Sequence, residues 1–207
     1  QKNSIPLLAR GGGSSQCGQT VGESVVLDYS KHQNKILELN VEEKYVWVEP
    51  GVVLDRLNEY LKPYGLWFPV DVSTSSRATI GGMSANNSCG SRSLYYGNMV
   101  HNVLAIEAIL DDGSIFTFDQ IEKNYLEKKN NQDRLYKIID KFIDLRQKVA
   151  TEIDDKWPTT QRRVGGYNID LIDTNGFNSS NLLVGSEGTL SLFNKIKLKL
   201  SEIPKNK

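Results

Sequence analysis

The stretch from residue 68 to residue 97 is the sequence feature that most limits how this chain can fold. It runs for about thirty residues, is rich in small polar side chains and has almost no hydrophobic period. A loop of this length inside a compact domain is usually functional or disordered. The scaffold must therefore come from the flanking segments, and the loop itself is available to wrap a ligand.

The flanking segments mix strand-like and helix-like patterns without regular alternation. Short apolar runs predict strands, with a hairpin at 36–49 and a second hairpin around the turn Asp111-Asp112-Gly113-Ser114. Apolar residues at helical spacing predict two helices. The strands are predicted at 5–9, 25–28, 36–39, 45–49, 103–110, 115–118, 182–184 and 190–200, and the helices at 53–61 and 132–152. This mixture predicts an α+β protein, so the glycine motifs below are not a Rossmann fingerprint.

The charge balance argues against nucleic acid as a partner. The chain has 25 basic and 25 acidic residues, so any bound anion must be held by local geometry and not by a bulk field. Cys17 and Cys89 are too few for a disulfide framework, which favours a reducing compartment. No metal-ligand spacing is present and no apolar run reaches the length of a membrane span. We expect a cytoplasmic protein without a metal site, in the cytosol itself or held at the inner face of the membrane by a partner.

The first motif is Arg10-Gly11-Gly12-Gly13-Ser14-Ser15, directly after a predicted strand. Glycines leave no Cβ to block a ligand, and successive backbone N–H groups can form a nest that binds an anion. Such a nest suits a pyrophosphate and needs no lysine cluster. The alternative is an ordinary glycine turn without a ligand.

Two further glycine motifs are weaker on their own. Residues 79–90 read TIGGMSANNSCG, and the same loop carries Asp71 and Ser73. Paired glycines allow a flat group to approach the backbone, and the amide and hydroxyl groups offer hydrogen bonds. Residues 185–190 read GSEGTL and lie between two predicted strands. Taken singly, residues 79–90 are better explained as a polar surface loop, and residues 185–190 as a simple hairpin turn.

Together these motifs resemble the FAD-binding domain of the FAD-linked oxidases related to vanillyl-alcohol oxidase and p-cresol methylhydroxylase. That family carries the same elements in the same order, and the pair Tyr96-Gly97 and the hairpin at 103–113 match as well. Residues 78–88 and Gly166-Tyr167-Asn168 are similar to the branch of D-lactate dehydrogenase, D-2-hydroxyglutarate dehydrogenase and the glycolate oxidase flavin subunit. Ser191 departs from the family, which usually has glycine there.

The resemblance implies a two-lobed FAD-binding fold with non-covalent FAD between the lobes. Residues 1–33 are expected to form a first lobe that lacks an earlier helix and strand, and residues 34–207 a second lobe. A C-terminal cap domain that completes the substrate pocket is expected to lie beyond this chain. The expected cofactor contacts are Arg10, Gly11, Gly12, Gly13, Ser14, Ser15, Asp71, Ser73, Thr79, Gly81, Gly82, Asn86, Asn87, Ser88, Gly90, Glu187 and Gly188.

The activity implied is oxidation of a D-2-hydroxy acid by hydride transfer to flavin N5, with a separate electron acceptor of unknown identity. No residue of this segment is an evident catalytic base, so the segment alone is expected to be inactive. Arg163 and Tyr167 are the only candidates for contacts near the flavin or a substrate carboxylate. Two alternatives stay open: an NADPH-dependent reductase of cell-wall precursors that shares the FAD fold, and a non-catalytic FAD electron-transfer module.

Overall fold

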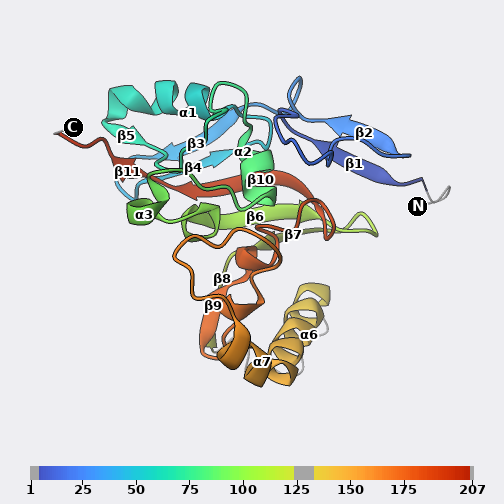
Figure 1. The fold of residues 1–207 in the computed structure, drawn as a ribbon. Coiled ribbons are helices and arrows are strands. Elements are labelled where there is room, and N and C mark those ends of the chain that lie inside the picture. Colours follow the sequence, from blue (N-terminus) through green and yellow to red (C-terminus); the bar gives the residue numbers. More distant parts are fainter. Residues whose placement is uncertain (1–4, 124–132, 206–207) are drawn as a thin grey trace.

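A five-stranded antiparallel sheet forms the centre of the molecule (Figure 1). The computed structural model describes residues 5–123 and 133–205. The strand order is β3-β4-β10-β6-β7, and every neighbouring pair is antiparallel. These strands are β3 (Ile36–Asn40), β4 (Tyr45–Val48), β6 (Val103–Ile109), β7 (Ile115–Phe118) and β10 (Leu192–Lys199). The predicted α+β class is confirmed, and the central sheet is not doubly wound.

Both predicted hairpins are present, but the strand between them comes from the other end of the chain. β3 pairs with β4, and β6 pairs with β7. β10 then fills the space between the hairpins, with Ile196 opposite both Val48 and Ile106. The apolar side chains of β10 therefore pack into a core together with two hairpins that are distant from β10 in the sequence.

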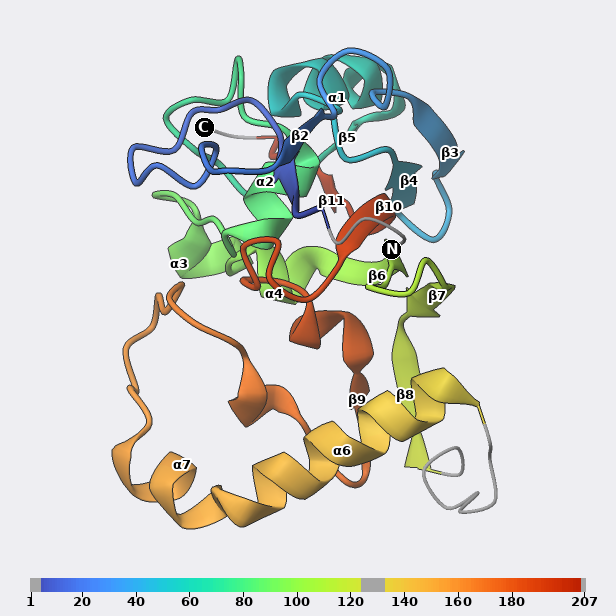
Figure 2. The ribbon, with the colours of Figure 1, turned by 90° about the vertical axis from the view of Figure 1, so that its right-hand side faces the viewer.

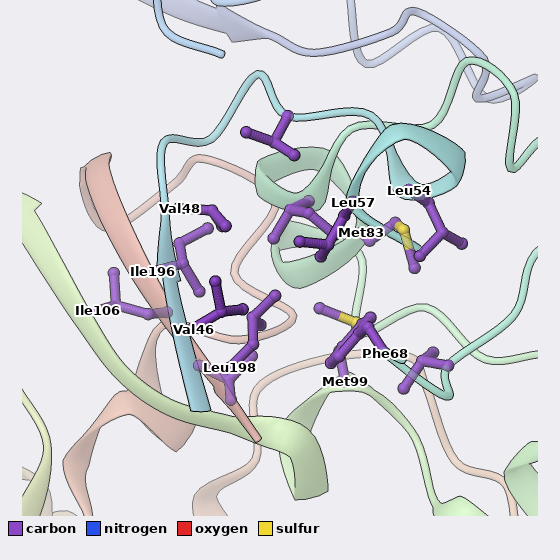
Figure 3. Close-up of a cluster of buried hydrophobic side chains, with 14 of the residues drawn as sticks. Val46, Val48, Leu54, Leu57, Phe68, Met83, Met99, Ile106, Ile196 and Leu198 are labelled. Carbon is purple, nitrogen blue, oxygen red and sulfur yellow. The ribbon is translucent and has the colours of Figure 1, made fainter. Parts of the chain in front are cut away.

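The main core lies between one face of this sheet and three helices (Figure 3). They are α1 (Leu54–Leu61), α2 (Ile80–Ala85) and α4 (Met99–Asn102). Leu54, Leu57 and Leu61 recur three and four residues apart, which places all three on the buried face of α1. They meet Val46, Val48, Ile196 and Leu198 of the sheet, and Phe68, Met83 and Met99 fill the space beside them. Burial of each large apolar side chain stabilises the fold by about 1.5–3 kcal/mol.

A smaller hydrophobic cluster stabilises the segment between β7 and β10. This segment lies beyond β6 and β7, at the end of the molecule away from α1 (Figures 1 and 2). Ile121, Ile139, Ile172, Phe177 and Leu182 form this cluster. The elements that carry it or flank it are β8 (Gln120–Glu122), α6 (Arg134–Lys148), α7 (Ala150–Lys156), η2 (Ile169–Leu171), β9 (Gly176–Asn178) and η3 (Ser179–Leu182).

The helix predicted at 132–152 is two helices. Its first residue lies outside the described part of the chain, and α6 ends where Val149 leaves helical geometry at φ −107° and ψ 19°. α7 then leaves in a new direction (Figure 2) and buries Ile153. The apolar spacing is helical on both sides of Val149, so the pattern alone did not show the break.

The strand predicted at 182–184 is wrong. Those residues complete the 3₁₀ turn η3 and the turn after it, because Leu183 and Val184 both donate their N–H groups to the Ser180 carbonyl. Asn178 starts this turn by accepting the Ser180 N–H at 3.0 Å. All three apolar side chains are buried, so the run had the composition of a strand for reasons of packing alone.

The N-terminal strands are where the sequence placed them, but they are not buried. β1 (Leu7–Arg10) and β2 (Val25–Asp28) form a separate two-stranded parallel sheet, called here the N-terminal lobe with the loop that joins them. Leu7, Val25 and Val26 are each more than 40% exposed. A two-stranded sheet has too little neighbouring structure to cover both faces.

The long loop at 68–97 contains two short helices, α2 and α3 (Ser93–Tyr96). The remaining short elements are η1 (Lys62–Tyr64), β5 (Leu66–Trp67) and β11 (Ser201–Glu202), which pairs with β5. No helix in the described ranges has both the length and the apolar character needed to cross a bilayer.

Candidate functional site

A cleft of about 430 Å³ lies between the N-terminal lobe, α2 and the start of β10. This volume is within the range of small-molecule and cofactor sites. Residues from all three glycine motifs line it, which brings together segments that are more than a hundred residues apart. Of the expected contacts, the lining includes Gly11, Gly12, Gly13, Ser14, Ser15, Ser73, Thr79, Gly81, Gly82, Asn86, Ser88, Glu187 and Gly188.

The first glycine loop packs closely against the second one. A Cβ on Gly11 would come within 2.2 Å of Thr79 Oγ1, and a Cβ on Gly12 within 2.2 Å of the Arg77 carbonyl oxygen. Real Cβ atoms do not approach other atoms so closely, so this contact requires glycine at both positions. The two loops therefore form one wall of the cleft.

The same loop holds a set of free donors. Within the described residues, the backbone N–H groups of residues 11–15 donate no hydrogen bond to the protein. The Arg10 guanidinium lies against Gly13, where an added Cβ would be 2.9 Å from Nη2. Consecutive free N–H groups beside a positive charge are suited to an anion such as a pyrophosphate. No lysine or arginine appears among the described residues that line the cleft.

In the described part of the chain, the N–H groups in the first turn of α2 all have protein acceptors. Thr79 caps the helix, and its Oγ1 accepts the Gly82 N–H at 3.3 Å. The N–H groups of Ile80 and Gly81 donate to the carbonyls of Val52 and Pro50. Gly81 is needed for packing, since a Cβ there would lie 2.6 Å from Pro50 Cβ. The second glycine motif thus shapes the cleft, whereas the first leaves its N–H groups free for a ligand.

The third motif forms a rim loop, defined here as residues 185–189. Its backbone is fixed to the end of α2, because Gly185 and Glu187 donate their N–H groups to the carbonyls of Ser84 and Ala85, each at 3.0 Å. Glu187 and Gly188 both have left-handed geometry, with φ of 51° and 78°. Among the described residues, the Gly188 N–H has no protein acceptor. The motif follows a 3₁₀ turn and not a strand, as the corrected assignment of 182–184 requires.

Four expected contacts are absent from the lining: Arg10, whose guanidinium lies against Gly13, and Asp71, Asn87 and Gly90, which lie behind it. The Asp71 carboxylate accepts the Ser91 hydroxyl at 2.8 Å and the Arg92 N–H at 3.1 Å. Gly90 packs so tightly on Asp71 that a Cβ would lie 2.2 Å from its carbonyl oxygen. Asn87 is fully buried and accepts the Val100 N–H at 3.0 Å. In the structure these side chains hold the loop in shape.

Arg163 and Tyr167, the candidates for flavin or substrate contacts, are outside the cleft lining. Arg163 forms an ion pair with Asp170 at 2.6 Å and stacks over the Trp157 ring. It also borders a second, polar cavity of about 190 Å³ together with His101. Burial, with the nearby Arg163 charge, lowers the pKa of His101. The Tyr167 hydroxyl lies 2.8 Å from Thr189 Oγ1 of the rim loop.

Sequence reasoning missed the apolar walls of the cleft. They come from different elements and share no local pattern. Burial raises the pKa of the Tyr29 phenol. The apolar and aromatic residues in the lining are Leu8, Ala9, Tyr29, Pro50, Val72, Ala78, Met83, Ala85 and Phe193.

The donor set fits FAD. The free N–H groups of the first loop suit its pyrophosphate, and the apolar walls suit flat heterocycles. Polar groups for a ribose or ribityl chain come from the serines and Asn86. No cluster of three or more metal-binding side chains occurs among the described residues.

Comparisons with known proteins agree with this geometry. The sequence pattern of the FAD binding domain matches residues 1–119. D-2-hydroxyglutarate dehydrogenase of Haemophilus influenzae is 38% identical over 97% of this chain, and that of Escherichia coli is 35% identical over 98%. The mitochondrial D-lactate dehydrogenase [cytochrome] of Arabidopsis thaliana is 29% identical over 98%. The chain spans only 20% of the length of the first two relatives and 27% of the third.

Among solved structures, an alkyldihydroxyacetonephosphate synthase superposes on 99% of this chain with a TM-score of 0.63. The chain spans 30% of that structure, and the two sequences are 19% identical. At this identity the likeness concerns the fold alone.

Proposed function

The chain belongs to the FAD-binding domain family, and from this membership we propose that it is the flavin domain of a dehydrogenase that oxidises D-2-hydroxy acids. The single observation that carries the proposed site is the row of free N–H groups at 11–15, in a loop that lines a cleft with apolar walls. The substrate class rests on the relatives, whose names specify D-2-hydroxyglutarate and D-lactate.

In the proposed site, each loop has a separate task. The N–H groups of the first glycine loop bind the pyrophosphate, with the Arg10 charge nearby. Thr79, Gly81 and Gly82 keep the wall flat, and Asn86 and Ser88 offer polar contacts. Glu187 and Gly188 close the rim, where the free Gly188 N–H offers one more donor.

FAD, when bound, supplies the two-electron redox centre. The proposed overall reaction turns the C2 hydroxyl of the substrate into a ketone, with loss of two electrons and two protons. The residues described here bind and orient the cofactor and keep water from its apolar parts. A base for the substrate hydroxyl is proposed to lie in another part of the protein, and the electron acceptor is proposed to be a separate partner.

The test uses the complete protein and its visible spectrum under anaerobic conditions. FAD binding should give the yellow absorption of a flavoprotein, and D-2-hydroxyglutarate or D-lactate should bleach it. The L-enantiomers serve as matched controls and should leave the colour unchanged. Bleaching by NADPH alone would favour the reductase alternative, and a bound flavin that none of these compounds reduces would favour an electron-transfer module.

A further inference from the structure

Two consecutive residues, Tyr167 and Asn168, contact the two ends of the rim loop. Asn168 hydrogen-bonds to the Val184 carbonyl, just before the loop begins, and Tyr167 hydrogen-bonds to the Thr189 hydroxyl at its end. We propose that this pair clamps the rim loop and so positions Glu187 and Gly188 against FAD. The inference rests on the proposed cofactor site, and it assigns Tyr167 to the rim loop in place of the substrate.

The first half of the clamp is a buried amide. Asn168 is 1% exposed, and its Nδ2 donates to the Val184 carbonyl at 2.7 Å. Its Oδ1 accepts Asn87 Nδ2 at 3.5 Å. Asn87 precedes Ser88 of the cleft wall, so Asn168 joins the second glycine motif to the start of the rim loop.

The second half of the clamp is a chain of two hydrogen bonds, called here the hydroxyl relay, in which the donor of each bond can be assigned. The Thr189 hydroxyl donates to the Ser186 carbonyl at 2.6 Å. Because this bond uses its only proton, Tyr167 must be the donor in the 2.8 Å contact with Thr189 Oγ1. Tyr167 thereby holds the turn that runs from Ser186 to Thr189.

The backbone of the rim loop explains why it needs a clamp. Glu187 has a Cβ and yet lies in the left-handed region, which is costly unless the surroundings enforce it. The hydrogen bonds to α2 fix only Gly185 and Glu187. Gly188 and Thr189 lie beyond these bonds, and within the described residues the Tyr167 hydroxyl is the one side chain from outside the loop that hydrogen-bonds to this half.

The experiment measures FAD affinity and the visible spectrum of bound FAD in the complete protein. Tyr167→Phe deletes only the hydroxyl and should weaken FAD binding by about threefold to tenfold, the range for one hydrogen bond. It should also change the shape or position of the flavin bands, because the rim donors shift. Asn168→Asp replaces the donor to Val184 by an acceptor and should weaken binding further.

The matched control is Tyr95→Phe, which makes the same change on a tyrosine that is 85% exposed and should leave both readouts unchanged. Thr189→Ser keeps the relay and should behave as the wild type. Thr189→Val breaks the relay, so Tyr167→Phe should add nothing in that background. The unfolding midpoint of the apoprotein, measured alongside, should fall only slightly for Tyr167→Phe, because the hydrogen bond that is lost is exposed.

Wild-type affinity and an unchanged spectrum for Tyr167→Phe would overturn the clamp, as would additive effects of Tyr167→Phe and Thr189→Val. A loss of affinity that only follows a lower unfolding midpoint, with unaltered flavin bands, would also overturn it. Failure of the wild-type protein to bind FAD would instead refute the proposed function.

Discussion

Adding one methyl group at Gly12 tests the assignment of the first glycine loop as the anion site. The alanine Cβ would be 2.2 Å from the Arg77 carbonyl oxygen, whereas ordinary contact begins at 3.4 Å, so the loops must separate by about 1.2 Å. Hydrogen bonds to oxygen span only about 2.7–3.2 Å, and a shift of this size breaks them. Each bond to a charged group contributes about 1.5–3 kcal/mol. Loss of two such bonds should raise the FAD dissociation constant by roughly two to four orders of magnitude.

The assay is titration of the apoprotein with FAD, followed by flavin fluorescence, with urea unfolding of the apoprotein as a second measurement. Gly12→Ala should lower the free energy of unfolding by at most about 3 kcal/mol, the usual cost of overpacking. Gly22→Ala is the control in the same lobe, because its Cβ would meet nothing closer than 3.7 Å. FAD affinity within threefold of the wild type for Gly12→Ala would refute both the close contact of the loops and the nest as the pyrophosphate site.

Two further outcomes follow from side chains outside the cleft. The Asn58 side chain accepts the N–H of buried Phe68 at 2.7 Å and donates to its carbonyl at 3.3 Å, so Asn58→Ala leaves two backbone groups without partners. Urea unfolding should show a loss of about 2–4 kcal/mol, and a loss below about 0.5 kcal/mol would contradict this pairing. Burial, with the Arg163 charge, lowers the pKa of His101 in the folded protein below its ordinary value of 6.5. The unfolded chain then binds more protons as pH falls below about 6.5, so stability should drop there. His101→Gln should remove this part of the pH dependence, whereas the same change at exposed His32 should not; equal slopes for both variants would count against it.

Local sequence patterns were sufficient to predict the strands that pair with a neighbouring strand in the sequence. The strands of β3–β4 and β6–β7 are joined by short turns, so both the pairing and the alternating burial are written in adjacent residues. α1 shows its buried face at Leu54, Leu57 and Leu61 for the same reason. The α+β class could be predicted because these signals are local.

Contacts between distant segments could not be predicted in this way. The alternation of β10 marks it as a strand but carries no information about its place between β4 and β6. α2 could not be predicted because its packing surface includes Gly81, which packs against Pro50, 31 residues earlier in the chain. The break at Val149 likewise depends on where α7 must go to bury Ile153.

At the site itself, the two glycine loops differ in whether their N–H groups are free, and this difference could not be predicted from local sequence either. In sequence, Gly11-Gly12 and Gly81-Gly82 look equivalent, and both were expected to contact the cofactor. Whether a glycine N–H is free for a ligand depends on which carbonyls surround it. Pro50 and Val52 take the N–H groups at the start of α2, whereas no protein group takes those of residues 11–15 within the described chain. The proposed pyrophosphate site therefore needs no net positive charge, because the fold leaves unpaired donors in one loop and satisfies those of the other.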